Sequence, residues 1–187
     1  MIHMSEVKSS AILVTGMPGS GKEEFIKRCI KRKIRVLRMG DLVREEASRS
    51  EIELTDEKVG TLAHRMREEN GFDHWAKKTL EKIDDRLTVI DGVRGRAELE
   101  LFKRELGKRA IVVAIHTSPA IRFERLRSRG RTDAPGSWEE FEARDQRELR
   151  WGLGDVISLA DHMIVNESSI GNFRRRAEAV IDEILGQ

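Results

Sequence analysis

An apolar run that ends in a glycine-rich turn and one lysine is the feature that most restricts how this chain folds. Residues 11–15 are of the types found in a buried strand. They are followed by Gly16, Met17, Pro18, Gly19, Ser20, Gly21 and Lys22. This stretch satisfies the first part of the G-x-x-x-x-G-K-[ST] pattern, in which backbone N–H groups surround a polyphosphate and the lysine reaches its outer phosphates. We therefore expect a strand, a phosphate-binding loop and a helix that opens at the lysine, rather than a simple turn.

The residue after this lysine departs from the pattern. Glu23 stands where Ser or Thr normally supplies a hydroxyl ligand for Mg²⁺. At an effective dielectric constant of about 20, a carboxylate about 4 Å from a phosphate charge is repelled by about 4 kcal/mol. A Mg²⁺ ion between the two groups reverses the sign of the interaction. We predict that Glu23 ligates this metal in place of the missing hydroxyl.

Four further apolar runs, at 34–39, 87–90, 110–116 and 162–165, alternate with helical stretches. This alternation is typical of βαβ units and of a parallel sheet with helices on both faces, so the fold class is α/β. The first helix, 22–32, is expected to bury Phe25, Ile26, Cys29 and Ile30, because their spacing forms one face. A length of 187 residues suits a single domain, 1–187.

Two polar segments interrupt the alternation. The first, about 41–86, is too long for one crossover helix. We expect one helix that opens at 41–44 and two more at 55–69 and 72–86, the last two separated by a stop at Asn70–Gly71. Since ligands bind beyond the carboxyl ends of parallel strands, this segment is predicted to bind an acceptor substrate. The second, about 128–150, is polar and contains Gly130 and Pro135–Gly136 as hinges, which predicts a mobile lid.

Two acidic residues follow predicted strands. Asp91 lies in an Asp-Gly step after the run 87–90, where P-loop enzymes place a carboxylate that holds Mg²⁺ directly or through water; the alternative is a plain turn. Asp41 follows the run 34–39 and is predicted to accept a proton from, or orient, an attacking hydroxyl. The alternative for Asp41 is an N-cap of the next helix, and both roles can hold together.

Arginines supply the remaining candidate site residues. Arg44, Arg67 and Arg94 are predicted to bind an anionic group of the acceptor, because a guanidinium pairs bidentately with phosphate or carboxylate. Arg125 and Arg129 lie four residues apart on one helix face. Positioned positive charge supplies much of the rate of phosphoryl transfer, so Arg129 joins Lys22 and Asp41 as a predicted catalytic residue. A solvated, ion-paired helix face is the alternative for these two arginines.

Composition disfavours several other functions. The net charge is only +2, and the basic residues concentrate in the predicted lid rather than on one continuous face, so we do not expect nucleic-acid binding. No apolar run approaches the roughly 20 residues that span a membrane. A single cysteine excludes an internal disulfide, and residues 1–10 lack an apolar leader segment. We therefore expect a cytoplasmic protein.

With these motifs, the chain resembles the P-loop kinases of small molecules, the nucleoside monophosphate kinase superfamily. Within it, the dephospho-coenzyme A kinases and an archaeal group of related P-loop kinases are most similar. Residues 16–22 match the superfamily's loop, and 91–94 are similar to its acid-glycine-arginine element after the third strand. Residues 125–129 are similar to the R-x-x-x-R of the helix that enters the lid. Residues 160–166 are similar to the A-D-x-x-I-x-N of dephospho-coenzyme A kinases.

This resemblance implies a three-layer P-loop NTPase fold whose five parallel strands are ordered 2-3-1-4-5, with a helical acceptor lobe and a lid. It also implies that Arg125 packs on the adenine of ATP, that Arg129 meets the phosphates, and that Asn166 borders the adenine. The function implied is ATP- and Mg²⁺-dependent phosphorylation of a small molecule, with dephospho-coenzyme A or a nucleotide as acceptor. Because of Glu23, the alternative is a nucleotide-binding switch or ATPase module with little transfer activity.

Overall fold

A five-stranded sheet forms the centre of the computed structural model, which describes residues 10–130 and 134–186, apart from the side chains of residues 56 and 57. All strand pairs are parallel, and the order is β2-β3-β1-β4-β5, as expected. The strands are Ala11–Thr15 (β1), Arg35–Arg38 (β2), Thr88–Asp91 (β3), Ala110–His116 (β4) and His162–Val165 (β5). The predicted runs therefore match the strands to within about one residue at each end.

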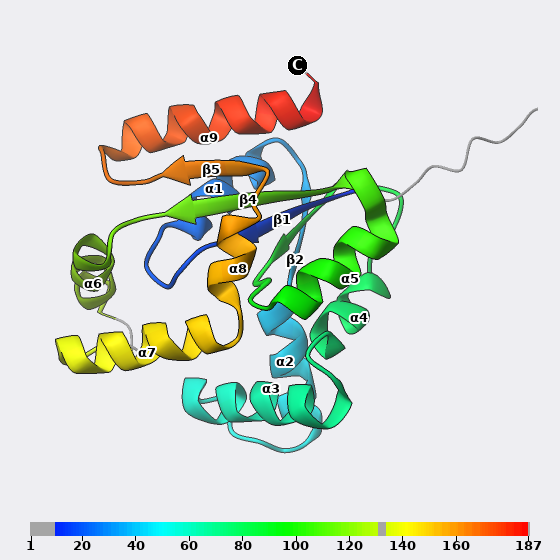
Figure 1. The fold of residues 1–187 in the computed structure, drawn as a ribbon, viewed down its shortest axis with the longest axis vertical. Coiled ribbons are helices and arrows are strands. Elements are labelled where there is room, and N and C mark those ends of the chain that lie inside the picture. The colour runs from blue at the N-terminus through cyan, green and yellow to red at the C-terminus, as the bar shows by residue number, and fades with distance from the viewer. Residues whose placement is uncertain (1–9, 131–133, 187) are drawn as a thin grey trace, which may run out of the picture.

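Helices cover both faces of this sheet (Figure 1). They are Lys22–Lys31 (α1), Met39–Arg49 (α2), Asp56–Asn70 (α3), His74–Leu80 (α4), Arg96–Leu106 (α5), Pro119–Ser128 (α6), Trp138–Arg150 (α7), Leu153–Ser158 (α8) and Ile170–Leu185 (α9), with a 3₁₀ turn at Gly107–Arg109 (η1). Helices α1 and α9 pack together on one face, and α5 and α8 contact strands on the other. Helix α5 lies between β3 and β4, where the alternation of runs and helical stretches places a helix, whereas α8 follows α7 as a further short helix before β5.

The strand side chains divide between two cores. Ile12 and Val14 of β1 pack with the buried residues of α1 and α9, whereas Ala11 and Leu13 pack with those of α5. This division follows from the alternation of side chains along a strand. Cys29 is buried in the first core, as expected, but Ile30 is half exposed. The α1 stripe is therefore narrower than predicted.

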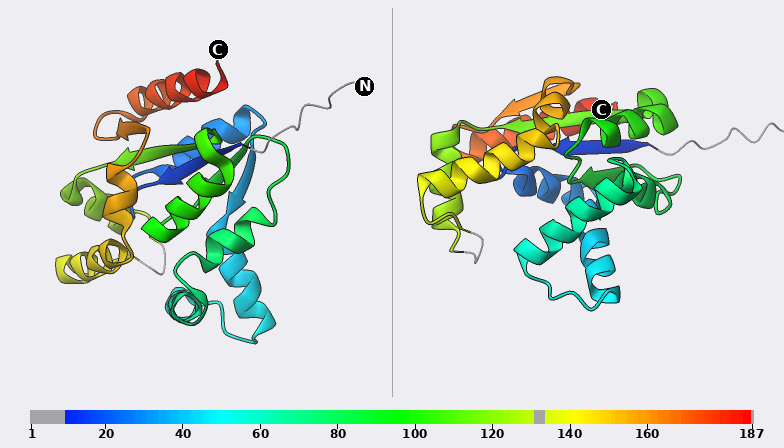
Figure 2. Two further views of the ribbon diagram at one scale, coloured as in Figure 1. Left: turned by 45° about the vertical axis from the view of Figure 1, so that its right-hand side comes forward. Right: turned by 60° about the horizontal axis from the view of Figure 1, so that its bottom comes forward.

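Helices α2, α3 and α4 form the excursion between β2 and β3 and project from one side of the sheet (Figure 2). Helix α3 is capped by Thr55, whose hydroxyl accepts from the N–H of Lys58, and it ends at Gly71 with a φ of 98°. The helix expected at 72–86 is shorter in the structure, where α4 covers only His74–Leu80. Helix α2 begins at Met39, so Asp41 is not its N-cap, which corrects that alternative.

Helices α6 and α7 form the second excursion, at the opposite side of the sheet's carboxyl edge (Figures 1 and 2). Residues 131–133 of the predicted lid lie outside the described residues. The ring of Phe123 on α6 contacts those of Trp138 and Phe141 on α7, with centroids 5.2 and 5.5 Å apart. These contacts hold the two helices together. Among the described residues, no helix combines the length and apolar character needed to cross a bilayer.

Candidate functional site

The glycine-rich loop between β1 and α1 has no room for a side chain at two of its positions. Gly21 has a φ of +104°, and a Cβ there would lie 2.3 Å from Nδ2 of Asn166. Gly16 has a φ of +145°, and its Cβ would lie 2.4 Å from the carbonyl oxygen of Ile115. Only glycine fits both positions. The hydroxyl oxygen of Ser20 is buried without a hydrogen-bond partner, so the loop retains an unused polar atom, which fits a site for a polyphosphate.

The loop is held from behind by residues after β4 and β5. Nδ2 of Asn166 donates to the carbonyl oxygen of Ser20 at 2.8 Å, and Oγ1 of Thr117 lies 3.1 Å from the same oxygen. Arg125 donates through Nη2 to the carbonyl oxygen of Asn166 at 2.9 Å. The side chain of Asn166 is therefore occupied with the loop in this structure. Burial, and then the neighbouring Arg129, lower the pKa of Arg125.

Lys22 closes the front of the loop. Its ammonium group donates to the carbonyl oxygen of Gly16 at 2.6 Å and approaches that of Met17 at 3.5 Å. Burial lowers the pKa of Lys22 to about 8, although the charge of Asp91 acts in the opposite direction. An anion close to this ammonium group would stabilise its charged form and raise the pKa again.

A pocket of about 340 Å³ lies in front of the loop. It is lined by side chains from both excursions and from the ends of β2 and β3. Its charged residues are Lys22, Arg38, Arg44, Arg94, Arg129, Arg144, Glu23, Asp41, Asp91 and Glu148. Six cations against four anions leave a positive excess, which suits a strongly anionic ligand. The structure thus brings most of the predicted site residues to one place.

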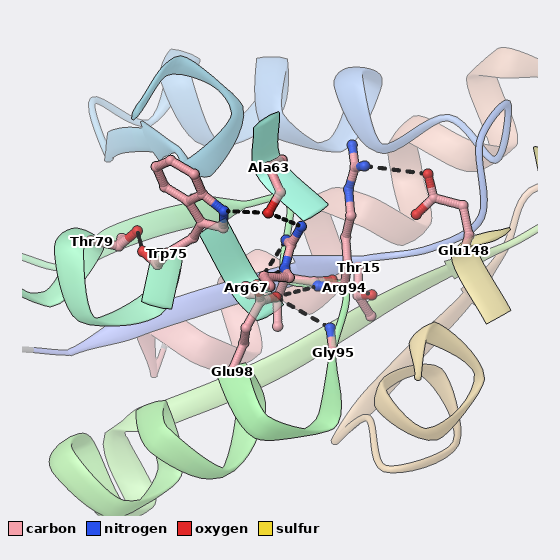
Figure 3. A network of polar contacts seen from close by, with 10 residues as sticks. Thr15, Ala63, Arg67, Trp75, Thr79, Arg94, Gly95, Glu98 and Glu148 are labelled. Carbon is pink, nitrogen blue, oxygen red and sulfur yellow. Dashed lines mark hydrogen bonds and ion pairs between the residues drawn. The ribbon is translucent and has the colours of Figure 1, made fainter. Parts of the chain in front are cut away.

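Arg67 is an exception, and its predicted contact with an acceptor is corrected by its position. Its side chain is 7% exposed, and Nη2 donates to Oε1 of Glu98, which is fully buried, at 2.9 Å (Figure 3). The other oxygen of Glu98 accepts from the backbone N–H groups of Arg94 and Gly95 at 2.8 and 3.2 Å. Arg67 therefore lies outside the pocket lining, in a buried network that fixes the loop after β3.

Arg94, by contrast, reaches the pocket. Its guanidinium pairs with Glu148 of α7 at 3.3 Å and lies 5.7 Å from the ring centroid of Trp151 (Figure 3 shows the ion pair). Asp41 and Arg44, one turn apart on α2, line the same pocket and are 3.4 Å apart. Both are more than half exposed, so they are accessible to a ligand.

Arg38 is a site residue that sequence reasoning missed. It ends β2, and the strand register places its Cα opposite that of Asp91. Its guanidinium contacts Asp91 at 2.9 Å and Glu23 at 3.0 Å, so the two predicted Mg²⁺ ligands share one cation. In the part of the chain that the structure describes, no group of three or more His, Cys, Asp or Glu residues is placed to hold a metal. Two carboxylates still suffice where phosphates complete the coordination of Mg²⁺.

Arg122 is a second residue that was missed. It is buried on α6, donates to the carbonyl oxygen of Pro18 at 3.2 Å, and makes a bidentate pair with Asp145 of α7 at 2.8 and 2.5 Å. This arginine connects the phosphate loop to both helices of the second excursion. No motif pointed to Arg122, because its partners lie far from it in the sequence.

Comparisons with known proteins place the chain in a family. Residues 15–142 match the model of the AAA domain family. The UPF0200 protein of Thermococcus onnurineus is 44% identical over 182 residues, which cover 94% of this chain and 98% of the relative. The UPF0200 protein of Hyperthermus butylicus is 46% identical over 187 residues, covering 98% and 100%.

Three solved structures share the fold. TT1252 from Thermus thermophilus has a TM-score of 0.63 at 18% identity, covering 94% of this chain and 98% of that one. A gluconokinase from Sinorhizobium meliloti has a TM-score of 0.60 at 16% identity, covering 94% and 93%. A shikimate kinase from Acinetobacter baumannii, in complex with shikimate, has a TM-score of 0.58 at 15% identity, covering 95% and 94%. At such identities the similarity concerns the fold.

Proposed function

The chain belongs to the AAA domain and UPF0200 families, and from the pocket that its P-loop builds we propose that it is an ATP- and Mg²⁺-dependent kinase of a small molecule. One observation carries the proposal. The phosphate loop with Lys22, the carboxylate pair of Glu23 and Asp91, and the accessible Asp41 line one pocket with a surplus of cations. The gluconokinase and the shikimate kinase, whose names describe transfer to small molecules, have the same fold.

Each part of the pocket has a proposed task. The loop amides and Lys22 bind the β- and γ-phosphates, and Arg129 neutralises charge on the migrating group. Glu23 and Asp91 would hold Mg²⁺, which when bound offsets the negative charge of the phosphates. Arg125 would pack on the adenine, as the resemblance implies, and in this structure it donates to the carbonyl oxygen of Asn166. Asn166 keeps the loop in shape through the carbonyl oxygen of Ser20.

The acceptor is proposed to be dephospho-coenzyme A or a nucleotide. Asp41 would orient the attacking hydroxyl or accept its proton. Arg44 and Arg94 would bind an anionic group of the same molecule, since both line the pocket near Asp41. Arg67 is left out of this set, because its guanidinium is paired with Glu98.

The test combines ATP binding with a transfer screen. Calorimetric titration with ATP, with and without MgCl₂, is followed by a radiolabelled-phosphate screen over dephospho-coenzyme A and nucleoside monophosphates. On the acceptor found, Asp41→Asn is expected to lower kcat by about 10²-fold or more, with an ATP affinity close to that of the wild type. The control is Glu45→Gln on the same helix, whose carboxylate pairs with Lys82 outside the pocket lining. An Asp41→Asn variant with wild-type kcat would remove the proposed role of Asp41.

A second candidate function has one specific observation in its favour. Glu23 replaces the usual hydroxyl and is tied to Arg38, an arrangement that also suits a nucleotide-binding switch or an ATPase module. Tight ATP binding without transfer to any acceptor in the screen would favour this second function. Transfer of phosphate to any acceptor in the screen would contradict this second function.

A further inference from the structure

Arg38 is a charged pocket residue to which the proposed function assigns no role. It ends β2 beside Asp91, while Glu23 approaches it from the first turn of α1. The side chain of Arg38 is 31% exposed and that of Asp91 is 19% exposed. The guanidinium is therefore part of the pocket wall, where solvent screens its ion pairs only partly.

The contacts of this guanidinium involve both predicted metal ligands. Nη1 donates to Oδ2 of Asp91 at 2.9 Å and lies 3.0 Å from Oε2 of Glu23. Nη2 donates to the other oxygen of Glu23 at 3.1 Å. Glu23 thus uses both of its oxygens on Arg38, and Asp91 uses one. Such charge-assisted, forked contacts are among the stronger polar interactions in proteins.

We propose that Arg38 is a resident cation that competes with divalent metal for Glu23 and Asp91, so that free metal binds weakly until nucleotide is present. This inference rests on the proposed function, in which these two carboxylates hold Mg²⁺. Mg²⁺ coordinates oxygen directly at about 2.0–2.1 Å, so a metal on Glu23 takes the place of the guanidinium. A triphosphate brings further oxygen ligands and negative charge, and both shift the competition toward the metal.

The experiment measures the affinity for free Mn²⁺, by the loss of its electron paramagnetic resonance signal, on the full chain without nucleotide. Arg38→Gln is expected to bind Mn²⁺ about tenfold more tightly than the wild type, because the cation that pairs with both Glu23 and Asp91 is lost. The matched control is Arg35→Gln. Arg35 begins the same strand but bonds to the carbonyl oxygen of Lys82 and to Asp84, outside the pocket lining. This control is expected to bind Mn²⁺ as the wild type does.

A second substitution tests whether the gain in Mn²⁺ affinity depends on the carboxylate of Glu23. Glu23→Gln combined with Arg38→Gln is expected to return the Mn²⁺ affinity to the wild-type value or below. Unchanged or weaker Mn²⁺ binding in Arg38→Gln, or a gain that persists in the double variant, would overturn the inference. If circular dichroism shows Arg38→Gln to be unfolded, Arg38→Lys replaces it, since an ammonium cannot grip both oxygens of Glu23 as a fork does. A folded Arg38→Lys variant without a gain likewise overturns the inference.

Calorimetric titration of the wild type with ATP separates this inference from the proposed function. A wild type that binds no ATP contradicts the proposed function, whatever the Mn²⁺ data show. A wild type that binds and transfers phosphate, while Arg38→Gln leaves the Mn²⁺ affinity unchanged, contradicts only the role given to Arg38. Adding a non-hydrolysable ATP analogue is expected to narrow the difference between wild type and Arg38→Gln, because the nucleotide itself favours the metal.

Discussion

At the residue scale, Lys22 makes nucleotide binding sensitive to pH. Burial lowers its pKa to about 8, and a bound polyphosphate stabilises the charged form and so raises that pKa. ATP affinity is therefore expected to be full below about pH 8 and to fall as the pH rises beyond it, by up to about tenfold per unit. Calorimetric titrations from about pH 7 to 9.5 would measure this loss.

Two lysine variants complete that experiment. Lys22→Met is expected to bind ATP weakly and with little dependence on pH over this range, because the titrating group is gone. Lys27→Met, on an exposed position of the same helix, is expected to follow the wild-type profile. A wild-type ATP affinity that stays flat across the range would contradict the assignment.

Some residues of the site can be recognised from local sequence patterns and others cannot. The loop, Lys22 and Asp91 belong to local patterns that are visible in the sequence, and all three contribute to the lining of one pocket. Arg38 belongs to no local pattern. Its position depends on the register of β2 against β3, and the spacing of residues along the chain contains no information about that register. Arg67 was misplaced for a similar reason, since its partner Glu98 lies 31 residues further on.

At the element scale, two glycine-to-alanine substitutions are expected to affect different properties, one the ATP affinity and the other the stability of the fold. Gly21→Ala places a Cβ 2.3 Å from Nδ2 of Asn166 in a left-handed backbone, so ATP affinity is expected to fall by about tenfold or more. Gly60→Ala lies within α3, where a Cβ meets no atom within 4 Å. It is expected to stabilise the fold by about 0.5–1 kcal/mol and to leave ATP binding unchanged.

Chemical denaturation and ATP titration of both variants would check this contrast. Gly60→Ala shows whether an added methyl group by itself disturbs the protein. Wild-type ATP affinity in Gly21→Ala would mean that the loop can rearrange around a side chain. The statement that only glycine fits at position 21 would then be wrong.

Strands were easier to predict than helices for a physical reason. A strand covered on both faces is an uninterrupted apolar run, as in residues 110–115 of β4, and its ends are visible in the sequence. Helix α8 has only six residues and opens after Gly152, so it offers too few turns for a periodic pattern. Helix α4 ends at Leu80, although the apolar spacing continues to Ile83, which packs partly buried against the core from outside the helix.

At the scale of the whole molecule, the Arg67–Glu98 pair connects helix α3 of the first excursion to α5 and to the loop after β3. Glu98→Ala would leave a buried guanidinium unpaired and two backbone N–H groups without an acceptor. The free energy of unfolding is expected to fall by about 3–5 kcal/mol, as measured by chemical denaturation.

The matched control lies on the same helix. Glu100 pairs with Arg96 at 2.7 Å, but both side chains are more than 60% exposed. Glu100→Ala is expected to change the free energy of unfolding by less than about 1 kcal/mol, because solvent screens that pair. Equal losses in Glu98→Ala and Glu100→Ala would show that burial does not set the strength of the Arg67 contact.

The fluorescence of Trp151 is expected to report acceptor binding, because two arginines lie close to its ring. The guanidinium groups of Arg67 and Arg94 lie 5.4 and 5.7 Å from its ring centroid. Of the other two tryptophans, Trp75 is fully buried and Trp138 packs on Phe123 and Phe141, and neither lines the pocket. An acceptor that draws Arg94 toward its anionic group changes the electrostatic field at the Trp151 indole and hence its fluorescence. Candidate acceptors can therefore be ranked by emission alone, before any turnover is measured.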